Sequence, residues 1–385
     1  MPRPLRVLLV APEASSDAAA AVLAERLISR HGAEVAAAGR SGLREVGVRL
    51  VCDTSPLGQV GVAAVVASVP LWWWVGRHIP KYVKAERPDV LVLFACRKFS
   101  LMLLNAIAGA RPPVAWVYPP GDWVQGDDRD DDVMRAADLY VSAFDWQAGR
   151  YERQGARVLR VPHHSVLPLT PEPDPGRLAE LRPSAEASPV IALMPGSRPD
   201  EVGRLMPIMA EALGQLAVAH PRLHAVVSQA PGVSEQRLSR YLVGLPCSHV
   251  VSPLRVRAIA AHADAAVVCC GTAATETAVA DCPQVIVYKP AWLTAKAMQR
   301  LGRRKNIRFL SMVNLGLDRR AVPELLHTDC TPERIVGEVS ALLTDAQSVA
   351  RMREDYREFR AAMGRGSWDA AADAIAALAQ RPGGR

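Results

Sequence analysis

The segment PGSRPDE at positions 195–201 carries the clearest set of side chains for binding an anion. Gly196 allows a tight backbone path, Ser197 offers a hydroxyl, and Arg198 carries a planar guanidinium that matches phosphate. The Pro-Asp-Glu that follows is typical of the first turn of a helix. Arg198 could also simply pair with Glu201. Because the segment follows an apolar, strand-like run, where α/β proteins bind ligands, we favour ligand contact.

A second candidate for anion binding is Gly271-Thr272-Ala273, which follows the apolar run AAVVCC and precedes Glu276. A helix that begins here would direct free backbone N–H groups and the Thr272 hydroxyl at a diphosphate. Glu276, one turn further on, could accept hydrogen bonds from ribose hydroxyls. The alternative is that Thr272 only caps the helix and Glu276 faces solvent.

A third candidate lies near the start of the chain, in PEASSD at positions 12–17. Ser15 and Ser16 are small hydroxyl residues at an expected helix start, which suits an anion or a sugar hydroxyl. Glu13 and Asp17 add carboxylates. The alternative is that Ser16 or Asp17 caps the helix.

Each candidate lies between an expected strand and an expected helix. The expected strands are Arg6–Ala11, Ala33–Ala38, Pro88–Phe94, Pro113–Tyr118, Asp138–Ser142, Arg157–Val161, Val190–Met194, Leu223–Ser228, Ala265–Cys270 and Gln284–Tyr288. Helical stretches such as Asp17–Arg30 and Glu201–Ala219 separate them, which predicts parallel βαβ units. Seven prolines between 162 and 189 interrupt the pattern and indicate a linker without a continuous element. We therefore predict an α/β protein with Rossmann-like domains at 1–165 and 190–350, a Pro-rich linker at 166–189 and C-terminal helices at 351–385.

The composition excludes several classes of protein. The 385 residues are 50% hydrophobic and 22% charged, which is inconsistent with a disordered chain, a collagen or a polytopic membrane protein. The seven cysteines show neither disulfide nor zinc-ligand spacing, so we expect a cytoplasmic protein without a metal site. The acidic run at 127–132 is expected to be a solvated loop that leads into a helix. The net charge of +7 comes without a stacking module or a concentrated basic patch, so nucleic-acid binding is not predicted.

A charge-free interval of 23 residues, 54–76, contains three consecutive tryptophans close to its end. Pro56, Pro70 and several glycines break it into pieces that are too short for a spanning helix. The tryptophans Trp72, Trp73 and Trp74 are followed by the cations Arg77 and Lys81. Aromatic side chains beside cations are typical of an interfacial membrane anchor, at about 1 kcal/mol per cation. The alternative is a helix buried in the domain core or against a dimer partner.

Together these motifs resemble the lipid-A-disaccharide synthase family. PGSRPDE resembles that family's PGSR followed by Glu, GTAATE its GTAxxE, PEASSD its GEASGD, and VYPPGDW its VSPQxW. The segment Phe309–Glu333 resembles the family's closing segment, and the resemblance extends from Val7 to the tail MGRGSWDAAADAIAAL. It implies an inverting glycosyltransferase of GT-B fold, in which two Rossmann-like domains with parallel sheets face an interdomain cleft.

The resemblance also implies roles for the two domains. The second domain would bind a UDP-sugar, with Arg198 and Thr272 at the phosphates and Glu276 at the ribose. Asn314 and Glu324 would lie in the same pocket. The complete implied donor set is Gly196, Ser197, Arg198, Glu201, Gly271, Thr272, Ala273, Glu276, Asn314 and Glu324.

The first domain would hold a lipid or glycolipid acceptor at the inner face of the cytoplasmic membrane, as a peripheral protein. Ser15 and Ser16 would contribute to that site. No cofactor or metal is expected, because Arg198 and a helix dipole would stabilise the departing UDP. Family members also form homodimers through their C-terminal portions.

The sequence departs from the family at Ala95–Ser100 (ACRKFS), where the family has APDFN with an important Asp. Arg97 and Lys98 stand in place of the carboxylate, and a cation is a poor general base. Either Glu13 or Asp17 supplies the base, or the acceptor differs, or the transfer reaction is lost. The two cations could instead bind an anionic acceptor headgroup such as a phosphate.

Two other functions remain open from the sequence. UDP-sugar 2-epimerases share the two-domain nucleotide-binding architecture, and an altered acceptor region would fit them. The tryptophan-rich basic segment would then be unexplained. A non-catalytic nucleotide- or lipid-binding relative would bind UDP without releasing it from any donor.

Overall fold

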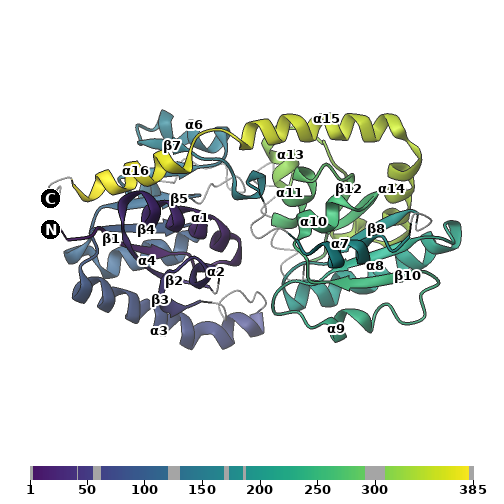
Figure 1. The fold of residues 1–385 in the computed structure, drawn as a ribbon, viewed down its shortest axis with the longest axis horizontal. Helices are drawn as coiled ribbons and strands as arrows, with labels where there is room; N and C mark the ends of the chain where they lie inside the picture. The colour runs from purple at the N-terminus through teal and green to yellow at the C-terminus, as the bar shows by residue number, and fades with distance from the viewer. Residues whose placement is uncertain are drawn as a thin grey trace. The chain divides into compact units, whose positions relative to one another are not determined.

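The structure is a computed structural model of the chain. It describes the backbone of residues 3–40, 42–54, 62–119, 131–168, 173–184, 188–290 and 308–380, and the side chains of these except 14–15, 62–73 and 131. The chain divides into two compact units, which we call unit 1 (Met1–His164 and Ala362–Arg385) and unit 2 (Ser165–Ala361) (Figure 1).

Unit 1 contains a seven-stranded sheet in the order β3-β2-β1-β4-β5-β6-β7. The strands are β1 (Arg6–Val10), β2 (Glu34–Gly39), β3 (Arg49–Asp53), β4 (Val90–Phe94), β5 (Val114–Val117), β6 (Leu139–Ser142) and β7 (Val158–Arg160). The helices are α1 (Ala14–His31), α2 (Gly42–Glu45), α3 (Val62–Glu86), α4 (Arg97–Ala106), α5 (Asp131–Met134), α6 (Asp145–Arg153) and α16 (Trp368–Ala379). All strand pairs are parallel, as the alternating pattern predicted.

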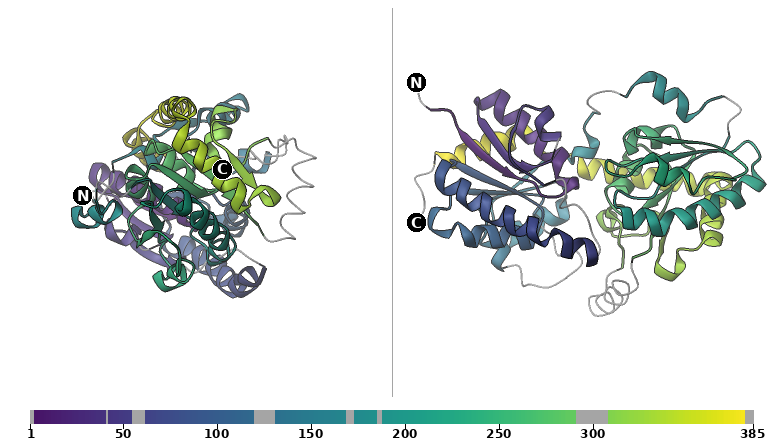
Figure 2. Two further views of the ribbon diagram at one scale, coloured as in Figure 1. Left: turned by 90° about the vertical axis from the view of Figure 1, so that its right-hand side faces the viewer. Right: turned by 90° about the horizontal axis from the view of Figure 1, so that it is seen from below.

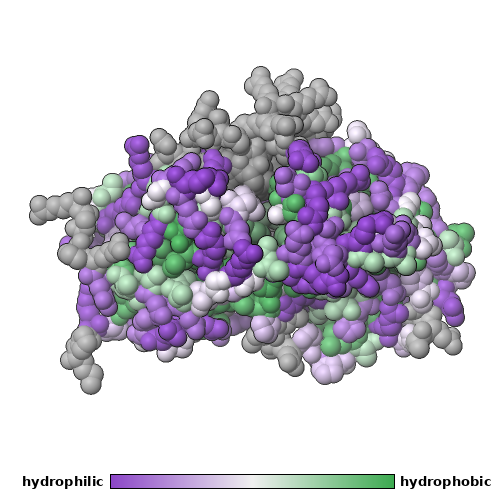
Figure 3. Space-filling view, turned by 90° about the horizontal axis from the view of Figure 1, so that it is seen from above, coloured by the Kyte–Doolittle hydropathy of each residue, from purple (hydrophilic) through white to green (hydrophobic). Residues whose placement is uncertain are grey.

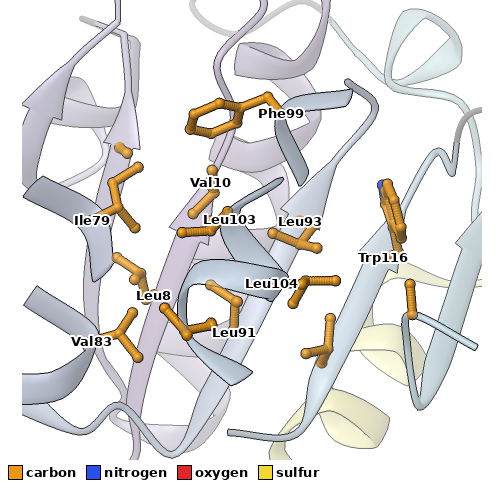
Figure 4. Packing of buried hydrophobic residues seen from close by; sticks show 14 of the residues in the cluster. Leu8, Val10, Ile79, Val83, Leu91, Leu93, Phe99, Leu103, Leu104 and Trp116 are labelled. Atoms are coloured by element: carbon orange, nitrogen blue, oxygen red, sulfur yellow. The ribbon is translucent and has the colours of Figure 1, made fainter. Parts of the chain in front are cut away.

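One core of unit 1 lies between the sheet and the helices α3 and α4. α3 contributes Val75, Ile79 and Val83, which are spaced four residues apart and are buried. α4 adds Phe99 and Leu103, and strand residues face them from β1 and β4 (Figure 4). Burying each such side chain contributes about 1.5–3 kcal/mol, which offsets the cost of prolines within α3. The backbone of α3 therefore continues through a proline that the sequence had indicated as a break.

The C-terminal helix α16 completes unit 1 by packing on α1 (Figure 1). Arg30 Nη2 lies 2.9 Å from Asp373 Oδ2. Before α16 the chain passes over β7 at Gly366, where φ is +86° and a Cβ would lie 1.8 Å from the Arg160 carbonyl oxygen. Trp368 Nε1 then donates to the Pro162 oxygen at 2.9 Å. The C-terminal helices, expected as a single segment, thus divide between the two units.

Unit 2 contains a six-stranded parallel sheet in the order β10-β9-β8-β11-β12-β13. The strands are β8 (Val190–Met194), β9 (His224–Ser228), β10 (Ser248–Ser252), β11 (Ala265–Cys269), β12 (Gln284–Tyr288) and β13 (Glu324–Leu326). The helices are α7 (Pro175–Leu181), α8 (Pro199–Ala219), α9 (Glu235–Ser239), α10 (Val256–Ala261), α11 (Thr272–Val279), α13 (Met312–Leu317), α14 (Pro332–Thr344) and α15 (Ala346–Met363), which crosses into unit 1 at its end. Helices lie on both faces of each sheet (Figure 2).

Part of the predicted linker is regular structure. Asp174 caps α7 by accepting from the Gly176 N–H at 2.7 Å, and a proline occupies the first turn, where it needs no hydrogen-bond partner. The expectation that no continuous element forms there was therefore wrong for Pro175–Leu181.

Candidate functional site

In both sheets the strand order reverses direction at one point. In unit 2 this point lies between β8 and β11, and in unit 1 between β1 and β4. Open α/β sheets bind ligands beyond the carboxyl ends of the strands at such a point. The motifs PGSR and GTAATE follow β8 and β11, whereas PEASSD and ACRKFS follow β1 and β4. The four motifs therefore occupy the two positions that the topology favours for ligands.

The β8 junction is shaped around Gly196 and Glu201. Gly196 has φ +104°, and a Cβ there would lie 2.7 Å from Glu201 Oε2 and 3.2 Å from Cys269 Sγ. Arg198, the N-cap residue of α8, pairs with Glu201 at 2.9 Å between Nη1 and Oε1. The ion pair that was the alternative to ligand contact is therefore present. It fixes one nitrogen of the guanidinium at the start of α8, while Ser197 beside it is exposed.

The β11 junction lies next to the β8 junction, because Val268 is in register with Met194 across the two strands. Gly271 is the N-cap residue of α11, and Thr272 is the first helical residue. Thr272 and Ala273 are half-buried. Thr272 therefore does not cap the helix, and the first-turn N–H groups receive no side-chain cap.

Two adjacent thiols lie at the carboxyl end of β11, on Cys269, its last residue, and on Cys270, which follows it. The pKa values of both respond to nearby carboxylates. Burial raises the pKa of Cys270 to about 12, and the charges of Glu324 and Glu201 raise it further. Burial also raises the pKa of Cys269 well above its usual range, with Glu201 contributing. Both thiols stay protonated, as buried cysteines that pack like small hydrophobes do. Glu324 and Glu201 therefore lie at the same end of β11.

Asn314 and Glu324 hold the segment before β13 together. Asn314 is fully buried and its amide makes four hydrogen bonds: to the Val322 oxygen, to Glu324 Oε1, and from the Ala321 and Val322 N–H groups. Glu324 also accepts from the N–H groups of Leu310 and Ser311 at 3.0 Å each. The Asn314 amide is thus fully used within this network. Asn314 thereby positions Glu324 beside the end of β11.

Glu276 does not simply face solvent, because it lies against the first turn of α10. Burial raises the pKa of Glu276, while the charges of Arg257 and Arg255 and a hydrogen bond from the Arg257 backbone lower it. The sequence had not indicated either arginine as part of the site.

At the unit 1 junction, Glu13 is exposed and serves as the N-cap residue of α1. Its carboxylate lies beside Cys96, the N-cap residue of α4. Burial raises the pKa of the Cys96 thiol to about 12, and the charge and a hydrogen bond of Glu13 add to that shift. β1 and β4 are neighbouring strands, which explains why residues 83 positions apart meet here. Cys96 was not a predicted site residue.

Asp17 and Ser16 are more deeply placed than Glu13. Asp17 accepts from the Arg40 N–H at 3.3 Å, and burial raises its pKa while the Arg40 and Gly42 backbones lower it. Ser16 is 2% exposed. The side chain of Ser15 lies outside the described residues. Asp17 therefore fixes the loop after β2, and Glu13 is the carboxylate that remains accessible.

The two cations that replace the family carboxylate differ. Arg97 Nη2 pairs with Asp132 Oδ1 at 2.7 Å, and Asp132, the last residue of the acidic run, is 52% exposed and lies in α5. Lys98 is exposed. The remainder of that run, 127–131, lies outside the described side chains.

The predicted membrane anchor lies on α3, which is neither wholly buried nor wholly exposed. Trp74 is 40% exposed and stacks on His78 with ring centroids 4.1 Å apart. Arg77 and Lys81 are exposed. The side chains of Trp72 and Trp73 lie outside the described residues. None of the helices in the described part of the chain has the length and apolar character needed to cross a bilayer.

Hydrophilic residues dominate the surface in the view of Figure 3, and hydrophobic residues form smaller patches between them. Among the described residues, no three His, Cys, Asp or Glu side chains are grouped closely enough to hold a metal ion.

Comparison with known proteins agrees with this geometry. The model of the family "Lipid-A-disaccharide synthetase" matches residues 7–378. The chain belongs to that family. The lipid-A-disaccharide synthase of Anaeromyxobacter dehalogenans strain 2CP-C is 31% identical over 364 residues, covering 93% of each chain. That of Myxococcus xanthus is 30% identical over 369 residues, covering 94% of each.

Solved structures share the fold at low sequence identity. Acinetobacter baumannii MurG has a TM-score of 0.56 and 16% identity, and covers 97% of this chain and 99% of its own. The calicheamicin glycosyltransferase CalG4 has a TM-score of 0.61 and 15% identity, and covers 98% and 99%. The UDP-GlcNAc 2-epimerase of Neisseria meningitidis has a TM-score of 0.58 and 10% identity, and covers 97% and 99%. Membership of the lipid-A-disaccharide synthetase family and these matches confirm the predicted GT-B fold and glycosyltransferase class.

Proposed function

We propose that the chain transfers a GlcN-type sugar from a UDP-sugar to a lipid-linked sugar acceptor, with inversion, in lipid A or related glycolipid biosynthesis. The observation that carries the proposal is the meeting of PGSR and GTAATE at the β8–β11 reversal point. There an arginine at the start of one helix lies beside the uncapped first turn of another. Two such groups converge on the position that a diphosphate would take.

Donor binding would use the groups around this junction. Arg198 and the first-turn N–H groups at Thr272 and Ala273 would bind the diphosphate, and Glu201 would hold the guanidinium in place through the 2.9 Å ion pair. As the bond from the anomeric carbon to the diphosphate oxygen breaks, negative charge grows on that oxygen. A positioned cation and helix N-terminus stabilise that charge, so the proposal needs no metal.

Glu13 is our proposed general base. It is accessible, it follows β1 at the reversal point of unit 1, and Asp17 is engaged by the backbone of Arg40 and Gly42. Glu13 would take the proton of an acceptor hydroxyl while that oxygen forms a bond to the anomeric carbon. UDP leaves from the opposite face with its bonding electron pair, which inverts the anomeric configuration.

The acceptor would bind at unit 1 and at a membrane surface. Lys98, which is exposed at the start of α4, would bind an anionic headgroup such as a phosphate, and Arg97 would assist from its position beside Asp132. The exposed Trp74, Arg77 and Lys81 on α3 would contact the headgroup level of the bilayer. We also propose peripheral attachment at the inner face of the cytoplasmic membrane, and a homodimer.

The test of the proposal is UDP release. The protein is incubated with a panel of UDP-sugars, each with and without a Gram-negative lipid extract. We expect UDP only when both donor and lipid are present. Isomerisation of the UDP-sugar without lipid would instead establish an epimerase, and UDP binding without release under any condition would establish a binding protein.

The membrane surface is tested separately. A variant with Trp72, Trp73 and Trp74 all replaced by Ala should lose cosedimentation with anionic liposomes, and undiminished cosedimentation would reject that role.

A further inference from the structure

Glu276 connects α11 with the first turn of α10. α11, which carries Glu276, packs against α10, and the Arg257 backbone and the charges of Arg257 and Arg255 lower the pKa of the Glu276 carboxyl. The N-cap residue of α10, Arg255, gives no side-chain cap. First-turn N–H groups lack partners within their own helix, and a negative charge near them is stabilising. Glu276, which we assign to the ribose, therefore also stabilises the first turn of α10.

The side chain of Arg257 extends from this turn to the segment through which the chain enters unit 2. Its Nη1 donates to the backbone oxygens of Ser165 and Leu167, at 2.5 Å each. The boundary between the units falls directly before Ser165. Hydrogen bonds from a cation are the stronger class, so these two bonds fix the first residues of unit 2.

Arg257 makes its two directed hydrogen bonds beside an open space that separates this segment from the helices. A cavity of about 520 Å³ lies between them. Its lining includes Val166, Leu167, Arg257, Ala258, Val279 and Ala280. An open space cannot transmit a change of position by close packing, whereas a pair of directed hydrogen bonds can.

We propose that Arg257 is a positioning residue that links Glu276 in the donor site to the entry segment, Ser165–Leu167. The inference rests on the proposed function, because that function assigns Glu276 to the nucleotide. A ribose hydroxyl that donates to Glu276 holds the carboxylate in place. The carboxylate holds the first turn of α10, and Arg257 holds the entry segment. Nucleotide occupancy and order of the entry segment are therefore coupled, and the coupling is reciprocal.

Hydrogen–deuterium exchange of the peptide 163–167, with and without UDP, tests the coupling. In the wild type, UDP should slow exchange of this peptide. In Arg257→Met and Glu276→Gln, basal exchange should rise about tenfold, the effect of losing a charge-assisted hydrogen bond, and the UDP-dependent slowing should disappear. Arg257→Lys keeps the charge but not the planar fork, so it should restore the slowing only in part.

Arg240→Met is the matched control, because it removes an exposed arginine of the same unit whose guanidinium hydrogen-bonds to its neighbour Tyr241. It should behave like the wild type. UDP affinity is measured in parallel by calorimetry, and thermal unfolding shows that each variant is folded.

The outcomes separate the inference from the proposed function. Equal UDP-dependent slowing in the wild type and in both variants would overturn the inference and leave UDP binding intact. Absence of UDP binding to the wild type would overturn the proposed function. The inference is then decided by the free protein, where an unchanged exchange rate in Glu276→Gln would refute it and a faster rate would support the Glu276–Arg257 link.

Discussion

Replacing Arg198 by Met removes the guanidinium at the start of α8 and keeps most of the aliphatic stem. The side chains of Arg198 and Glu201 are 44% and 16% exposed, so their ion pair is well solvated on one side. Exposed pairs of this kind contribute about 0–1 kcal/mol to stability. A donor aimed at the charge that develops in the transition state is worth more, about 10²–10³ in kcat, or roughly 3–4 kcal/mol. We therefore expect a large loss of rate and a small loss of stability.

The assay is steady-state UDP release at saturating acceptor, with kcat and KM for the UDP-sugar determined separately and thermal unfolding recorded for each variant. The matched variant Glu201→Gln keeps the guanidinium but weakens its orientation, and we expect about a tenfold loss of kcat. A wild-type kcat/KM in Arg198→Met would refute the assignment. So would a rate loss no larger than the loss in unfolding free energy predicts, because Arg198 would then be structural.

Four further outcomes follow from the structure. Glu13→Gln should lower kcat by about 10²–10⁴ without changing UDP affinity, and an unchanged kcat would exclude Glu13 as the base. Lys98→Asp should weaken acceptor binding more than UDP binding, and equal losses in the two titrations would contradict the headgroup role. Gly366→Ala should lower the free energy of unfolding by about 2 kcal/mol or more, because its Cβ would lie 1.8 Å from the Arg160 oxygen at a φ of +86°; chemical denaturation with an unchanged midpoint would contradict this. Burial lowers the pKa of His164 to about 4 from 6.5, so the folded state disfavours the protonated ring. The free energy of unfolding is therefore unaffected by this residue above pH 6.5, and it falls by about 3 kcal/mol as the pH is lowered to 4. His164→Gln should flatten the pH dependence of the unfolding free energy over that range, and a profile that stays parallel to the wild type would contradict the assignment.

The sequence predicts the central strands well, because they are buried on both faces and appear as continuous apolar runs. Pro88–Phe94 and Val190–Met194 match β4 and β8 closely. The edge strands β3, β10 and β13 were not predicted. β10 (SHVVS) is partly exposed and mixes polar with apolar residues, so its pattern does not distinguish it from a loop.

The candidate site could also be predicted only in part from the sequence. Glycines and hydroxyl residues at the ends of predicted strands are visible in the sequence, since the strand-to-helix junction restricts which residues fit. Contacts between segments that are distant in the sequence cannot be predicted in this way. Cys96 meets Glu13 only because β4 lies beside β1, and Arg257 meets Ser165 only because α10 packs near the start of unit 2. No local pattern in the sequence indicates either contact.

The central claim is an inverting transfer from a UDP-sugar to a lipid-linked acceptor. Its most direct test is to purify the lipid product that the wild-type protein forms from a UDP-sugar with an α-linked sugar, and to determine its mass and anomeric configuration by mass spectrometry and NMR. The account predicts one added sugar in a β linkage and one UDP released per product molecule. An α linkage would contradict the inverting mechanism, and a UDP-sugar epimer with no glycosylated lipid would contradict the transfer itself.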